Sequence, residues 1–270
     1  MRRYLIILMM PCFVMLFGIC CLAGCEGSRH HLKKVRLNEV AHSIFYAPQY
    51  VAIEKGYFEK EGIKLELTTG FGADKTATAV ISGDADIAFM GPEATIYQFN
   101  QGNADYLINF AQLTQRAGNF VVSREKEDSF KWEDLKGKKV IGGRPGGMPE
   151  MVFEYVLKKH GMNPQKDINL VQNIDFANTS GAFVSGEADY TVEFEPAATL
   201  IEEQGAGYVV ASVGKESGYV PYTAFSAKES YIKKHPELIQ SFTNALQKGM
   251  TYVNNHSAAE IAKVIAPQFK

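Results

Sequence analysis

Hydrophobic and polar residues alternate in short stretches from residue 35 onward, and segments with helical spacing separate these stretches. The alternation over 35–40 and 63–68 predicts two strands, and the apolar run at 87–90 predicts a third. Apolar residues recur with a helical period over 50–56 and 73–82, which lie between the strands. Strands separated by helices of this length indicate an α/β fold, with mainly parallel sheets flanked by helices.

A second series of strands and helices begins after a charged stretch at 124–131. Its predicted elements are strands at 138–142, 169–171 and 208–211 and a helix at 148–160. Strand-like passages at 119–123 and 222–226 bracket this series, as two crossings between lobes would do. We therefore expect a first lobe over 35–122 and 223–270, a second lobe over 123–222, and hinges near Ser123 and Thr223. Because the chain stops at Lys270 directly after a helical pattern, we expect the first lobe to be incomplete at its C-terminus.

One phrase occurs twice, as SGDAD at 82–86 and as SGEAD at 185–189. In each copy glycine is suited to end a helix, and the last aspartate is suited to a turn or cap hydrogen bond before the next strand. We therefore interpret these acidic residues as structural. Ligands of open parallel sheets lie beyond the carboxyl ends of the strands, beside helix N-termini. The functional residues should then lie a few positions further on, at 90–93 and 193–195.

Composition narrows the class of protein. The chain of 270 residues is 46% hydrophobic and 21% charged, with a formal net charge of −2, so no field strong enough to gather nucleic acid is present. All four cysteines lie at or before Cys25. The remainder of the chain therefore has no disulfide and no cysteine-based metal site.

The N-terminus has the features of an export signal. Arg2 and Arg3 precede an apolar run over 4–19, which the residues Leu-Ala-Gly-Cys follow at 22–25. This ending resembles the bacterial lipobox, in which the cysteine, here Cys25, becomes the lipid-modified first residue. We expect 1–25 to be a lipoprotein signal, and the polar segment 26–34 to tether an exported domain to the outer face of the cytoplasmic membrane.

Three stretches resemble a known family. They are HSIFYAPQYVAIEKGYF at 42–58, EGIKLE at 61–66, and the phrase SGDAD. Together they are similar to the extracytoplasmic solute-binding proteins of ABC importers for thiamine pyrimidines, riboflavin, alkanesulfonates and nitrate. The resemblance implies a type II periplasmic-binding-protein fold, in which two lobes close on a solute and present it to a membrane permease and its ATPase.

Some members of this family are enzymes that synthesise pyrimidines with pyridoxal phosphate, a histidine and a cysteine-rich motif. The lack of cysteine after position 25 argues against that branch, and so does the lipobox. We therefore expect a binding protein without a cofactor and not an enzyme.

The candidate ligand contacts lie at predicted strand ends, in glycine-rich loops and near the crossings. They are His42, Phe45, Tyr46, Phe71, Gly72, Met90, Gly91, Glu93, Gln112, Thr114, Arg144, Gly146, Gly147, Met148, Glu193, Phe194, Glu195 and Tyr222. Bare N–H groups in the loops 70–73 and 142–150 suit a polar ligand atom, but the second loop lacks the ending of a P-loop. No second ligand-type residue stands near His42 in the sequence, so we expect no metal there.

Several roles stay open at this point. Phe45 and Tyr46 suit stacking on a planar ring or packing of the first helix, and Tyr222 suits closing over a ring or bracing the hinge. Gln112 and Thr114 suit ligand contact or a polar strand end. Arg144 suits an anionic ligand or a partner among Glu193 and Glu195.

The preference between two kinds of solute rests on Glu93, Glu193 and Glu195. Buried carboxylates need donors or cations, which favours an aminopyrimidine over a sulfonate. The sequence thus predicts a binder of a planar nitrogen heterocycle such as a thiamine pyrimidine precursor, and an alkanesulfonate or nitrate binder is the alternative.

Overall fold

The computed structural model describes residues 32–270, in which strands and helices alternate as the sequence pattern predicts. Within this range five strands form a first sheet in the spatial order β2, β1, β3, β10, β4. Their bounds are Ile63–Thr69 for β2, Lys33–Glu39 for β1, Ile87–Met90 for β3, Thr223–Lys228 for β10 and Leu107–Thr114 for β4. β1 is parallel to β2 and β3, whereas β10 is antiparallel to β3 and β4. One strand is therefore reversed in an otherwise parallel sheet.

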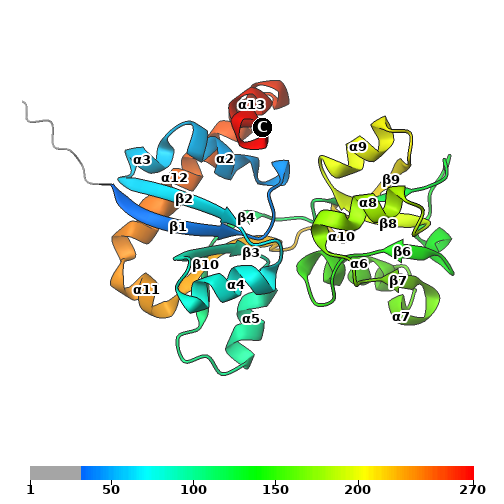
Figure 1. Cartoon of the computed structure of the whole chain (residues 1–270), viewed down its shortest axis with the longest axis horizontal. Helices are drawn as coiled ribbons and strands as arrows, with labels where there is room; N and C mark the ends of the chain where they lie inside the picture. Colours follow the sequence, from blue (N-terminus) through cyan, green and yellow to red (C-terminus); the bar gives the residue numbers. More distant parts are fainter. Residues whose placement is uncertain (1–31) are drawn as a thin grey trace, which may run out of the picture. The chain divides into compact units, whose positions relative to one another are not determined.

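Helices cover both faces of this first sheet (Figure 1). They are α2 (Ala47–Glu54), α3 (Tyr57–Lys60), α4 (Ala73–Ser82), α5 (Glu93–Asn100), α11 (Glu229–Lys234), α12 (Pro236–Asn255) and α13 (Ala258–Ile265), with 3-10 turns η1 (Ile44–Tyr46) and η4 (Ala266–Phe269). Tyr50 of α2 and Phe242 of α12 lie in the core of one face, and Ala77 of α4 lies in the core of the other. The sheet and these helices make up the first lobe.

A second sheet has the same plan, in the order β7, β6, β8, β5, β9. Its strands are β7 (Asn169–Val171), β6 (Lys139–Ile141), β8 (Tyr190–Phe194), β5 (Asn119–Ser123) and β9 (Tyr208–Ser212). The flanking elements are α6 (Met148–Lys159), α7 (Pro164–Asp167), α8 (Thr179–Val184), α9 (Ala197–Glu203), α10 (Val213–Ser217), η2 (Trp132–Leu135) and η3 (Phe176–Asn178). Here β5 is the reversed strand, since it pairs antiparallel with both β8 and β9. These elements make up the second lobe.

Each reversed strand belongs to a different sheet from the strand that precedes it in the chain. β5 follows β4 of the first sheet directly but belongs to the second sheet, and β10 returns to the first. Our boundary at residue 122 therefore assigned most of β5 to the wrong sheet, because an apolar strand of five residues carries no sign of its pairing partner. The crossings lie at 115–118, between β4 and β5, and at 219–222, between α10 and β10.

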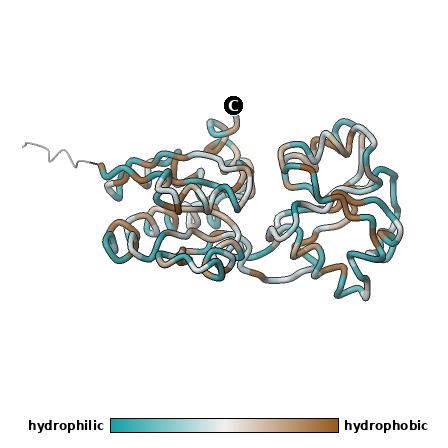
Figure 2. Tube along the Cα trace, turned by 60° about the horizontal axis from the view of Figure 1, so that its bottom comes forward, coloured by the Kyte–Doolittle hydropathy of each residue, from teal (hydrophilic) through white to brown (hydrophobic). Residues whose placement is uncertain are grey.

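Hydrophobic positions lie in the interior of each lobe, and hydrophilic positions lie on its outer turns and helix surfaces (Figure 2). The repeated phrase ends a helix in each lobe, with φ of 89° at Gly83 and 99° at Gly186, a region that glycine adopts readily. None of the helices within 32–270 is both long and apolar enough to cross a membrane. The proposed signal, Cys25 and most of the tether lie outside the described residues.

Candidate functional site

A cavity of about 530 Å³ lies between the two lobes and takes its walls from both. The segments that line it follow the carboxyl ends of β1, β2 and β3 in one lobe and of β6, β7 and β8 in the other. This is where ligands bind in open α/β sheets, since loops and helix N-termini meet there. The position that the repeated phrase indicated is therefore the position of the cavity.

Most of the residues predicted from the sequence line this cavity. They are His42, Tyr46, Gly72, Gly91, Glu93, Arg144, Gly146, Gly147, Met148, Glu193, Phe194, Glu195 and Tyr222. The structure thus brings together segments that lie up to 180 positions apart, His42 and Tyr222 among them.

Five predicted residues lie outside the cavity wall. Met90 is fully buried in the core beside α4, because the last residue of β3 turns inward and Gly91 faces the cavity. Phe45 packs behind the wall, with its ring centroid 5.8 Å from that of Phe194 and 5.8 Å from that of Tyr222. Phe71 projects outward and is 53% exposed.

The other two, Gln112 and Thr114, belong to β4 at the crossing. The Gln112 side chain donates to the Thr114 carbonyl at 3.2 Å. The Thr114 hydroxyl pairs with the hydroxyl of Thr223, the first residue of β10. The Gln112 bond therefore lies within β4, and the Thr114 bond joins β4 to β10, as a polar strand end would.

Glu93, the first residue of α5, is 4% exposed and reaches across the cleft. Its Oε1 accepts a hydrogen bond of 2.9 Å from the backbone N–H of Met148, at the start of α6 in the second lobe. Its Oε2 is buried and has no partner among the described residues. Burial raises the pKa of this carboxyl.

Gly91 makes the position of this carboxylate possible. A Cβ at residue 91 would lie 2.0 Å from Glu93 Oε2, closer than two atoms can approach. The Glu93 side chain therefore folds back over the glycine, and any larger residue at position 91 would displace it.

Tyr222 is 1% exposed, and its hydroxyl is buried without a partner among residues 32–270. Burial raises its pKa well above the ordinary value, and the nearby Tyr46 and Glu93 raise it further. The pKa of Tyr46 is raised by burial and by the charges of Glu39 and Glu93. The charge of Glu93 thus acts on two tyrosine hydroxyls at the cavity, those of Tyr46 and Tyr222.

The carboxylates of the other two predicted glutamates, Glu193 and Glu195, already accept hydrogen bonds from protein groups. Glu193 accepts from the hydroxyl of Thr179 at 3.1 Å and from that of Thr191 at 2.7 Å. Burial nevertheless raises its pKa to about 7. Glu195 accepts from the backbone N–H of Thr199 at 3.1 Å and so caps α9.

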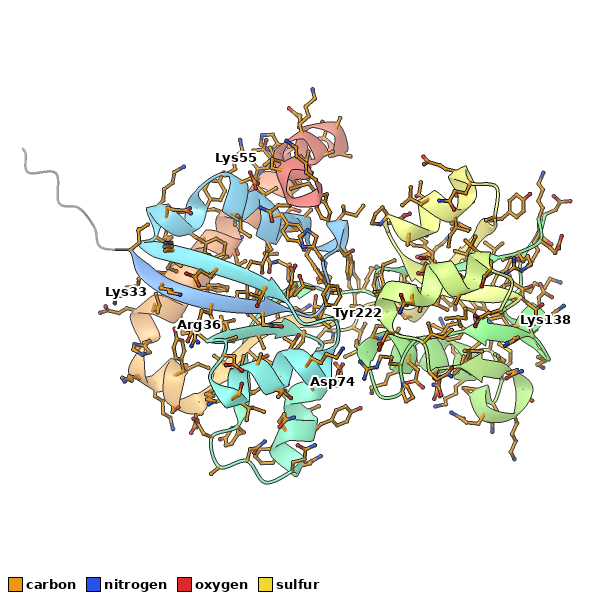
Figure 3. The ribbon with its side chains drawn as sticks, viewed as in Figure 1. Lys33, Arg36, Lys55, Asp74, Lys138 and Tyr222 are labelled. Atoms are coloured by element: carbon orange, nitrogen blue, oxygen red, sulfur yellow. The ribbon has the colours of Figure 1, made fainter. Side chains whose placement is uncertain are left out.

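Arg144 pairs with Asp74 and not with Glu193 or Glu195, which the sequence left open as partners beside an anionic ligand. Its guanidinium lies 3.2 Å from the Asp74 carboxylate of α4, and both side chains are more than a third exposed. The ion pair therefore crosses the cleft at its mouth, and Asp74 and Tyr222 both lie where the lobes meet (Figure 3).

Two further side chains, Tyr97 and Ser43, donate hydrogen bonds across the cleft. The Tyr97 hydroxyl donates to the Gly146 carbonyl at 3.0 Å, and the Ser43 hydroxyl donates to the Glu195 carbonyl at 3.0 Å. Each joins a loop or helix of one lobe to a strand-end loop of the other, so the two lobes meet around the cavity.

His42 is held by protein groups on both ring nitrogens. Nδ1 lies 2.7 Å from the buried carboxylate of Glu39, and Nε2 lies 2.8 Å from the carbonyl of Gln268. His42 therefore anchors the residues after α13 to the end of β1. Within 32–270 no cluster of three potential metal ligands occurs.

Sequence reasoning missed several wall residues, among them Asp74, Tyr97, Phe176 and Ser180. The strand-end rule that found Glu93 also indicates the segment after β7, where Phe176 and Ser180 lie. Tyr97 follows Glu93 by four positions on α5, and so lies on the same helix face. Asp74 follows the predicted loop 70–73, so the same rule indicates its position, but its pairing with Arg144 had no signal because Arg144 stands 70 positions away.

Comparison with known proteins identifies the family. A profile of the family described as NMT1/THI5 like matches residues 44–259. The chain is 50% identical over 258 residues to a Bacillus subtilis (strain 168) protein named "Putative binding protein YtlA", which covers 96% of this chain and 77% of that one. It is 22% identical over 232 residues to the riboflavin-binding protein RibY of Chloroflexus aurantiacus, which covers 84% of this chain and 64% of RibY.

A solved structure supports the same fold. The alkanesulfonate-binding protein SsuA from Xanthomonas axonopodis pv. citri, bound to MOPS, superposes with a TM-score of 0.71 at 18% identity, covering 87% of this chain and 78% of SsuA. At this identity the likeness concerns the fold alone. The resemblance read from the sequence is confirmed, and the chain belongs to the NMT1/THI5-like family and has the fold of the periplasmic binding proteins.

Proposed function

We propose that this protein is the solute-binding component of an ABC importer and captures a planar nitrogen heterocycle, such as a thiamine pyrimidine precursor. The observation that carries the proposal is the cavity between the lobes, which is lined by both aromatic rings and buried carboxyl groups. The rings belong to Tyr46, Phe176, Phe194 and Tyr222. Such rings offer stacking area, and a few polar groups fix orientation.

The charges at the cavity favour a ligand with hydrogen-bond donors. Glu93 is buried there with one unpaired oxygen, and a carboxylate accepts hydrogen bonds but an anion cannot supply them. Arg144 is partly exposed and already paired with Asp74. The name of RibY, a riboflavin-binding protein, adds a relative whose ligand is a heterocycle.

An alkanesulfonate or nitrate is the second candidate. The helices α4, α5 and α6 begin at the cavity, and helix N-termini attract anions. SsuA bound to MOPS shares the fold. In this case Arg144 would leave Asp74 and bind the anion.

The residues that line the cavity suit binding more than pyridoxal-phosphate catalysis. The cavity wall, as described within 32–270, includes neither a lysine for a Schiff base nor a cysteine. We therefore propose that the solute leaves the cleft unchanged, and that the partners are a membrane permease and its ATPase.

Capture would proceed by closure about the two crossings, 115–118 and 219–222. We propose that the first lobe comprises 33–114 and 223–270 and that the second comprises 119–217. The aromatic ring of Phe45 lies against Gly118, where a Cβ would be 2.6 Å from it. This tight contact supports the proposed pivot at the crossing.

A thermal-shift series tests the choice of solute. The purified protein is heated with pyrimidines, flavins, sulfonates and nitrate. A ligand at a hundred times its Kd adds about 2.7 kcal/mol to the free energy of unfolding. We expect pyrimidines or flavins to raise Tm, and stabilisation by the anions alone would overturn the heterocycle assignment.

We propose further that Cys25 carries the lipid anchor at the outer face of the cytoplasmic membrane. Cys25→Ser removes the thiol that would be modified. We expect the variant to leave the membrane fraction and enter the soluble extracytoplasmic fraction, and an unchanged distribution would contradict the anchor.

A further inference from the structure

The three glutamates at the cavity differ in the hydrogen-bonding capacity that remains to them. Both oxygens of Glu193 accept from threonine hydroxyls, and the half-buried Glu195 caps α9. Glu93 uses Oε1 for the Met148 N–H, while its buried Oε2 has no partner among the described residues. Glu93 is therefore the glutamate whose free acceptor requires a donor from elsewhere.

A second unpaired atom belongs to the same cavity. The Tyr222 hydroxyl is buried without a partner in the described part of the chain, and the Glu93 charge is among the influences on its pKa. A hydroxyl both donates and accepts, whereas an ionised carboxylate only accepts. Leaving either atom unpaired in the interior is costly, so a ligand that pairs with both gains affinity from them.

We propose that Glu93 and Tyr222 are the specificity-determining pair, and that they bind a ligand edge on which an amino group stands beside a ring nitrogen. The amino N–H donates to Glu93 Oε2, and the Tyr222 hydroxyl donates to the ring nitrogen. This assignment rests on the proposed function, because it names the group by which the heterocycle is recognised.

Glu93 also connects recognition with closure. Its Oε1 holds the backbone N–H of Met148 in the second lobe, while Oε2 meets the ligand. A ligand donor fixes the orientation of the carboxylate and so favours the bond to Met148. Ligands without this donor would bind without stabilising the closed arrangement to the same extent.

Three pyrimidines of similar size test the proposal by isothermal titration calorimetry. They are 4-aminopyrimidine, 4-methylpyrimidine, which lacks the donor, and pyrimidin-4-one, which presents an acceptor beside a ring N–H. We expect the wild-type protein to bind the amino compound at least tenfold more tightly than the others. Glu93→Gln places an amide donor at this position and should reverse the preference in favour of pyrimidin-4-one.

Tyr222→Phe supplies a variant whose folding is not at risk, because it removes a hydroxyl that has no partner. We expect an unchanged or higher Tm without ligand and an affinity for 4-aminopyrimidine lowered about tenfold, or about 1.4 kcal/mol. The matched control is Glu66→Gln on β2, where Glu66 forms an exposed ion pair with Lys34 of β1, and it should keep the wild-type preference.

The outcomes separate this inference from the proposed function. An equal loss of all three pyrimidines in Glu93→Gln, or a wild-type affinity in Tyr222→Phe, overturns the role of the pair while the heterocycle assignment stands. Binding of sulfonate or nitrate with no binding of any pyrimidine or flavin by the wild-type protein overturns both.

Discussion

Asp86 and Asp189 make the same pair of hydrogen bonds in the two lobes. Asp86 Oδ2 accepts from the backbone N–H of Arg36 at 2.8 Å, and its own N–H donates to the Arg36 carbonyl at 2.9 Å. Asp189 repeats both bonds with Lys139, at 2.8 Å and 2.9 Å. The repeated phrase thus fastens each turn to a neighbouring strand, as its interpretation as a structural element predicted.

Replacement of these aspartates should destabilise the two lobes unequally. Asp189→Ala loses one exposed hydrogen bond, which contributes about 1 kcal/mol, whereas Asp86→Ala also loses two bonds from the Arg36 guanidinium and should cost about 2–3 kcal/mol. Urea denaturation measures both. Asp84→Ala, whose carboxylate takes only the Ser82 hydroxyl, is the control and should change the free energy of unfolding by less than about 0.5 kcal/mol.

Glu193 should make the protein less stable as pH rises. Burial raises the pKa of its carboxyl to about 7, so the folded state holds a proton that the unfolded state releases near the ordinary glutamate pKa of 4.5. The stabilisation is complete below pH 4.5 and is lost as pH rises through about 7, by up to about 3 kcal/mol. In Glu193→Gln, the free energy of unfolding should depend less on pH between these two values.

Chemical denaturation at a series of pH values measures this slope. Glu187→Gln, at an exposed position of the same lobe, should keep the wild-type profile. A slope in Glu193→Gln as steep as that of the wild-type protein would show that another group carries the pH dependence.

Substitutions at the ion pair of Arg144 and Asp74 distinguish a heterocyclic solute from an anionic one. If the ligand is a heterocycle, Arg144→Ala and Asp74→Ala break the same exposed contact, which contributes about 0–1 kcal/mol, and should weaken binding alike and by less than about fivefold. If the ligand is an anion, Arg144→Ala should abolish binding and Asp74→Ala should strengthen it. Titration of both variants with a pyrimidine and a sulfonate gives the answer, and opposite effects of the two substitutions would contradict our assignment.

Two helix glycines should respond to alanine with opposite signs. Gly249 of α12 lies against α2, and a Cβ there would be 2.2 Å from the Pro48 carbonyl oxygen. Gly249→Ala should therefore destabilise the protein by about 1–3 kcal/mol, although alanine favours helices. Gly181→Ala in α8, where no atom lies within 4 Å of the new Cβ, should stabilise it by about 0.5–1 kcal/mol. The midpoints of urea denaturation compare the two, and a stabilised Gly249→Ala protein would argue against the close packing of α12 on α2.

Local patterns in the sequence determine the order of the elements and the end of the sheets at which the cavity lies. The strand at 119–123, the helix at 73–82 and the strand at 87–90 have the same bounds in the structure, because side-chain period and turn residues act over a few positions. The rule for strand ends then led to Gly91, Glu93 and Phe194 without knowledge of the partner lobe.

The tertiary structure alone decides which of these residues is free to bind. From the sequence Glu93, Glu193 and Glu195 are three equivalent carboxylates beside strand ends. The Met148 partner of Glu93 stands 55 positions away and the Thr179 partner of Glu193 stands 14 positions away, so no local pattern reveals these two bonds. For the same reason the sequence does not show to which sheet β5 belongs. The pairing of strands depends on which surfaces meet in the folded protein and not on the strand's own residues.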